Sequence, residues 1–165
     1  MAGGKYPIVT GLEHDEMGHP SGSPAMHTKM TDKRRDKLVA LSKELPVPTV
    51  YGDTSGDVLI VAWGSTSGPM KEATDRMRTE GHKVGCMTMR HIHPMPAGLQ
   101  DTFKQFKHVV VVEINDRGVY GYGQLAMLMR AAYGMAHIQS VTKTDGLAYR
   151  IREIVTGVEK ILAAG

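Results

Sequence analysis

A five-residue turn, Gly64-Ser-Thr-Ser-Gly68, is the stretch of this sequence best equipped to bind a ligand. It follows an apolar run, residues 58–63, that is typical of a strand buried on both faces. Pro69 then suits the first turn of a helix. Backbone N–H groups at a helix amino terminus and three hydroxyl groups can hold a phosphate or a carboxylate. The candidate anion-binding turn therefore consists of Gly64, Ser65, Thr66, Ser67 and Gly68.

A structural role explains the same turn more simply, because a tight strand-to-helix connection also needs small residues. The turn is not a P-loop, since no Gly-Lys-Ser/Thr ends it, and neither serine stands in a nucleophile elbow with a placed base. Gly121-Tyr-Gly123 lacks the rest of a dinucleotide-binding fingerprint. We also expect Gly64→Val to crowd the turn, because a branched side chain would enter a tight connection.

Histidines and the single cysteine are the other residues that can do chemistry. His14 and His19 stand five residues apart, and Gly18 and Pro20 break any helix that would carry both toward one metal ion. Cys86 lies among apolar residues in a predicted strand, which favours a buried core thiol. One cysteine allows no internal disulfide and no cysteine-only cluster, and it suits a reducing cytoplasm. We expect no metal site and no catalytic residue here.

The composition is that of an ordinary globular domain. Of 165 residues, 41% are hydrophobic and 22% are charged, and the net charge of +3 is too small to indicate nucleic-acid binding. No run approaches the roughly 20 apolar residues that a membrane helix needs. The sequence therefore predicts one α/β domain that binds neither nucleic acid nor membrane.

The chain divides into an arm and a repeating part. Residues 1–30 are poor in core residues and are predicted to form an extended arm, and residues 31–165 form the domain. Thr31 caps a predicted helix over 31–45, and Thr49-Val-Tyr51 forms an edge strand, where proline is tolerated. In the βα core, 58–165, strands are expected at 58–63, 83–90, 109–114 and 138–141. A closing helix starts near Thr144 or Asp145 and includes Leu147. This alternation implies a mostly parallel sheet with helices on both sides.

Three stretches together resemble the α subunit of 2-oxoacid:ferredoxin oxidoreductases, best the 2-oxoglutarate type. The first is Thr10-Gly-Leu-Glu-His-Asp-Glu-Met-Gly-His-Pro20 with His27, Met30 and residues 34–37. The others are Leu59-Ile-Val-Ala-Trp-Gly-Ser-Thr66 with Arg90-His-Ile-His-Pro-Met-Pro96, and Val112-Glu-Ile-Asn115 with residues 121–130. Their order and spacing make the match specific over nearly the whole chain.

The resemblance implies a fold like the carboxyl-terminal domain of transketolase. That fold is a three-layer α/β/α arrangement with a five-stranded, mostly parallel sheet and one antiparallel edge strand, here residues 49–51. It also implies that the chain is one part of a larger cytoplasmic enzyme. The expected partners are a preceding pyrimidine-binding domain of the same subunit and a separate β subunit, and the surfaces that meet them can also support homo-oligomers.

The implied parent enzyme decarboxylates a 2-oxoacid and yields an acyl-coenzyme A, with thiamine diphosphate, Mg²⁺, an iron–sulfur cluster, coenzyme A and ferredoxin. By matched position, the resemblance places interdomain or site-facing residues at Glu13, His14, Asp15, Glu16, Arg90 and His91. This chain alone lacks the diphosphate motif and the cluster ligands. It is therefore expected to bind no cofactor, to be inactive by itself, and to serve subunit assembly and active-site closure.

The sequence is also compatible with two other functional hypotheses. The chain can be a freestanding flavodoxin-like module that binds a phosphate or nucleotide at the Ser65–Ser67 turn. It can also be a regulatory module that responds to coenzyme A, for which the sequence offers no separate signature.

Overall fold

The computed structural model describes residues 11–164, and the chain divides into two units, one that ends at Glu44 and one that begins at Leu45. The first unit contains a loop followed by helix α1, Pro24–Glu44. The predicted helix start at Thr31 is therefore wrong, and so is the extended arm for residues 24–30. The backbone N–H of Met26 lies 3.5 Å from Ser23 Oγ, and Pro24 occupies the first helical position. Met30 is the only buried residue of α1, so apolar periodicity gave no signal for the first turns.

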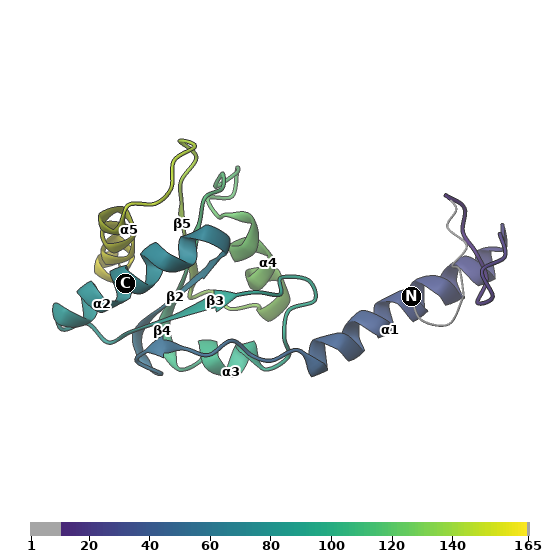
Figure 1. Cartoon of the computed structure of the whole chain (residues 1–165), viewed down its shortest axis with the longest axis horizontal. Coiled ribbons are helices and arrows are strands. Elements are labelled where there is room, and N and C mark those ends of the chain that lie inside the picture. Colours follow the sequence, from purple (N-terminus) through teal and green to yellow (C-terminus); the bar gives the residue numbers. More distant parts are fainter. Residues whose placement is uncertain (1–10, 165) are drawn as a thin grey trace. The chain divides into compact units, whose positions relative to one another are not determined.

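The second unit is built on a five-stranded sheet in the order β1-β3-β2-β4-β5 (Figure 1). Strands β2 to β5 run parallel, and β1 pairs antiparallel with β3 at the sheet edge. The antiparallel edge strand is thus confirmed, although it covers residues 51–52 rather than the predicted 49–51, and the mostly parallel α/β sheet is confirmed. The strands are β1 Tyr51–Gly52, β2 Gly56–Trp63, β3 Val84–Met89, β4 Phe106–Glu113 and β5 Ile138–Thr142.

Helices cover both faces of this sheet and bury two cores. Successive side chains of a strand point to opposite faces, so Val58, Ile60 and Ala62 of β2 face one core while Leu59 and Val61 face the other. The first core is closed by α2 and α5, and the second by α3 and α4. Helix bounds are α2 Ser67–Thr79, α3 Leu99–Phe103, α4 Gln124–Tyr133 and α5 Ile151–Ala164, with a short 3₁₀ turn at Gly64–Thr66 before α2. Cys86 is buried in the first core, as predicted.

The closing helix starts later than its apolar pattern indicated. It begins at Ile151, and Leu147, predicted on its buried face, is 59% exposed in the preceding loop. Asp145 accepts a hydrogen bond from the Leu147 backbone N–H, and Gly146 has a φ of +79°, so a turn replaces the first helical residues. The Glu153 carboxylate then accepts the Arg150 N–H at 2.8 Å and fixes the helix start there.

A buried carboxylate at the end of β4 joins several of these elements. Glu113 is 1% exposed, and its two carboxylate oxygens accept the backbone N–H groups of Leu125 and Ala126 at 3.0 and 3.1 Å. These N–H groups belong to the first turn of α4, where the helix dipole favours a negative charge. The hydroxyl of buried Tyr149 donates to the backbone oxygens of Glu113 and Val141, and so ties the loop before α5 to β4 and β5.

We expect Gly123→Ala to destabilise the protein by about 1–3 kcal/mol, because its Cβ would overlap the Glu113 carboxylate that caps α4. Gly68→Ala is the matched control, since nothing lies within 4 Å of a Cβ at that position of α2. Urea unfolding of both variants measures the difference. Equal unfolding midpoints for Gly123→Ala and Gly68→Ala would show that the carboxylate is not held closely against α4.

Candidate functional site

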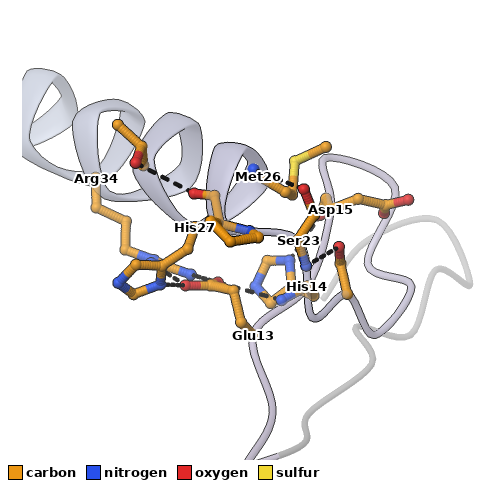
Figure 2. A network of polar contacts seen from close by, with 10 residues as sticks. Glu13, His14, Asp15, Ser23, Met26, His27 and Arg34 are labelled. Carbon is orange, nitrogen blue, oxygen red and sulfur yellow. Dashed lines mark hydrogen bonds and ion pairs between the residues drawn. The ribbon is translucent and has the colours of Figure 1, made fainter.

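Four of the predicted site residues, Glu13 to Glu16, lie in the loop before α1, and we call them the acidic-loop residues. The carboxylate of Glu13 binds side chains of α1 within the first unit (Figure 2). Arg34 Nη2 lies 2.5 Å from Glu13 Oε1, and His27 Nδ1 lies 2.7 Å from Glu13 Oε2. The Arg34 guanidinium first and His27 second lower the pKa of Glu13 to about 2. Glu13 is therefore an anionic anchor between the loop and the helix, with both oxygens engaged.

The three residues that follow Glu13 are also engaged inside the first unit. Asp15 accepts the backbone N–H groups of Met17 and His19, both at 2.9 Å, and so closes the loop. His14 Nδ1 lies 2.7 Å from the Asp15 carbonyl oxygen. Glu16 pairs with Lys29 and, at 3.4 Å, with Lys33 on α1. Over residues 11–164, no three His, Cys, Asp or Glu side chains gather as a metal site. The contacts of residues 13–16 thus hold the loop against α1.

The turn Gly64–Gly68 lies at the carboxyl end of the central strand β2, where open α/β sheets usually bind ligands. Thr66 is buried, and the Ser67 hydroxyl donates to the Gly64 carbonyl oxygen at 2.9 Å, so the Ser67 hydroxyl serves the turn itself. The expected crowding by Gly64→Val is wrong, because no atom lies within 4 Å of a Cβ there. Any penalty comes instead from the φ of +62°. Anion binding at this turn stays a prediction.

Arg90 and His91 follow the carboxyl end of β3 and line a groove of about 600 Å³ in the second unit. The groove runs between the segment 46–51 and the first turn of α2, over the edge of the sheet. Its lining residues are Pro46, Val47, Pro48, Thr49, Val50, Tyr51, Met70, Lys71, Cys86, Thr88, Arg90 and His91. Of the predicted site residues, Arg90 and His91 thus share one concave surface, whereas the four acidic-loop residues belong to the other unit.

A second surface was not predicted from the sequence: apolar side chains are exposed at the carboxyl ends of β2, β4 and β5. Trp63 ends β2, Ile114 follows β4, and Val119, Tyr120 and Leu147 lie in the loops after β4 and β5. Their exposed fractions run from 41% to 92%. We call these five residues the apolar crest. The loops after β4 and β5 project from the same end of the sheet in Figure 1.

Within residues 11–164, no helix combines the length and the apolar character needed to cross a bilayer.

The ion pair at Glu13 gives a testable pH dependence. Because the folded pKa is lowered from 4.5 to about 2, the pair stabilises the loop fully above pH 4.5 and loses this effect as the pH falls from 4.5 toward 2. Arg34→Leu should raise the Glu13 pKa toward its ordinary value, as a carboxylate NMR titration would measure. Arg35→Leu is the control, since Arg35 pairs with Asp32 instead. An equal Glu13 pKa in both variants would contradict the pairing.

Comparison with known proteins agrees with this architecture. A family model for the pyruvate:ferredoxin oxidoreductase core domain II matches residues 56–154. The chain is 32% identical over 162 residues to the α subunit of 2-oxoacid:ferredoxin oxidoreductase 2 from Aeropyrum pernix, which covers 96% of this chain and 24% of that protein. The chain therefore spans about a quarter of the length of the curated relatives it matches.

Two solved structures are similar to this chain, one in sequence and fold and the other in fold alone. A 2-oxoglutarate:ferredoxin oxidoreductase from Magnetococcus marinus, described with 2-oxoglutarate, coenzyme A and succinyl-CoA bound, has a TM-score of 0.80 and 34% identity, over 95% of this chain and 27% of that one. A split-gene transketolase shares the fold alone, with a TM-score of 0.56 and 21% identity over 70% of this chain and 41% of that one. This chain belongs to the pyruvate:ferredoxin oxidoreductase core domain II family, as a domain of the kind found in 2-oxoacid:ferredoxin oxidoreductase α subunits.

Proposed function

We propose that this domain is a non-catalytic part of a cytoplasmic 2-oxoacid:ferredoxin oxidoreductase of the 2-oxoglutarate type. In that role it helps the subunits assemble and closes the surroundings of the active site while a 2-oxoacid is converted to an acyl-coenzyme A. Support comes from the relatives, which are α subunits about four times as long as the chain. The Magnetococcus marinus relative holds substrate, coenzyme A and product of such a reaction.

The chemistry of the described residues agrees with a supporting role. Thiamine diphosphate with Mg²⁺ and an iron–sulfur cluster would supply the decarboxylation and the electron transfer in the parent enzyme. The single cysteine, Cys86, is buried in the core, and a cluster needs several thiolate ligands. Glu13 and Asp15 are engaged in contacts within their own unit. We therefore expect the cofactors to be bound by this domain's two expected partners, which are the preceding domain of the α subunit and the β subunit.

The apolar crest is the observation that carries the assembly role. Val119 is 92% exposed and Tyr120 is 75% exposed, on a loop that also leaves Ile114 open to solvent. Large apolar side chains gathered on one end of a domain mark a surface that a partner covers, and aromatic residues are enriched at the centres of such interfaces. The crest stands at the carboxyl ends of parallel strands, the edge at which α/β domains usually meet their ligands.

The double variant Val119→Ser with Tyr120→Ser tests this role. We expect it to bind the remaining part of the α subunit and the β subunit at least about tenfold more weakly, because anchors of this kind carry about 1–2 kcal/mol each. Its melting temperature should stay unchanged, since both side chains are exposed. Val39→Ser on α1, also an exposed apolar residue, is the control. Sedimentation of the mixed subunits measures the affinities. Unchanged binding by the double variant would contradict the assembly role of the crest.

A further inference from the structure

We propose that the groove lined by residues 46–51, α2 and the end of β3 binds a small organic anion, a phosphate or carboxylate carried on an apolar body. This site is separate from the apolar crest, and it does not depend on the assembly role. Its volume of about 600 Å³ lies within the range of small-molecule sites, roughly 300–1,000 Å³. Its lining divides into a cationic end and an apolar wall.

The cationic end consists of Lys71 and Arg90, and the imidazole of His91 lines the groove next to Arg90 in the sequence. Among the groove's lining residues there is no aspartate and no glutamate. Within residues 11–164, neither Lys71 nor Arg90 pairs with a carboxylate, whereas neighbouring cations such as Arg76 and Arg78 do. A concave surface with unpaired cations attracts an anion, and a guanidinium matches a phosphate or carboxylate in two parallel hydrogen bonds. Thr88 adds a hydroxyl group from β3.

The apolar wall comes from Pro46, Val47, Pro48 and Met70. Two prolines fix the backbone of this segment, so the wall needs little ordering when a ligand binds. A mostly apolar wall with few polar groups that fix orientation is the usual composition of a small-molecule site.

Tyr51 connects the wall to the cationic end. Its hydroxyl donates to the Asp75 carboxylate, at 2.9 and 3.1 Å from the two oxygens, which holds the ring in place. Lys71 Nζ lies 5.5 Å from the centre of the same ring. The Asp75 carboxylate is thereby engaged by the tyrosine. The ring and the ammonium group form a prearranged contact for a ligand that is apolar at one end and anionic at the other.

Titration of the whole ¹⁵N-labelled chain by NMR tests the site with three probes: phenyl phosphate, benzoate and inorganic phosphate. We expect both aromatic anions to shift the amide signals of residues 49–51, 71 and 88–91 with saturation. Inorganic phosphate should bind at least about tenfold more weakly than phenyl phosphate, because it leaves the apolar wall unfilled. The ratio of phenyl phosphate to benzoate affinity distinguishes a phosphate ligand from a carboxylate ligand. Shifts centred on residues 64–68, or scattered without saturation, would overturn the proposal.

Charge reversal supplies the matched comparison. We expect Arg90→Glu and Lys71→Glu each to weaken phenyl phosphate binding about tenfold to a hundredfold, as the loss of a charge-assisted hydrogen bond does, and Arg90→Lys to lose less. Lys160→Glu on α5 makes the same change of net charge outside the groove. Equal losses in Lys160→Glu and Arg90→Glu would show attraction by net charge alone and would overturn the site. The amide spectrum of each variant verifies that it is folded.

Discussion

The buried carboxylate of Glu113 is the contact on which the functional end of this domain depends. Burial removes this carboxylate from water, and two backbone N–H groups in the first turn of α4 replace the lost hydrogen bonds. This fixes where α4 begins relative to β4. Tyr149 donates to the Glu113 carbonyl oxygen and so anchors the next loop. The loops that carry the apolar crest are therefore held at both their strand and their helix ends, which a surface for a specific partner requires.

The two surfaces of the second unit lie at the same edge of the sheet. Because β2 to β5 are parallel, their carboxyl ends meet there, and both the crest and the groove begin where these strands end. The crest follows β2, β4 and β5, whereas the groove lies at the end of β3 and beside the segment that precedes the antiparallel strand β1. An apolar surface suited to a protein and an electropositive groove suited to a small anion can thus be occupied independently.

Much of the fold could be predicted from the sequence because the two central strands contain continuous apolar runs, residues 58–63 in β2 and 109–112 in β4. Where the predicted helix boundaries are wrong, short-range polar contacts rather than apolar periodicity determine where the helix begins. Ser23 and Pro24 start α1 earlier than its apolar side chains indicate, and Asp145 with Gly146 removes Leu147 from α5. At the site, Arg90 and His91 could be named from the family resemblance. The groove around them could not, because it joins β3 to α2 and to the segment before β1.

We propose that this domain supports catalysis without performing it. The experiment that decides this is to measure 2-oxoglutarate-dependent formation of succinyl-coenzyme A by three samples from one organism. These are the pure chain, the other subunits with the domain deleted from the α subunit, and the two mixed. We expect no product from the pure chain, little from the deleted complex, and recovery of activity on mixing. Product from the pure chain, or full activity of the deleted complex with no effect of mixing, would contradict it.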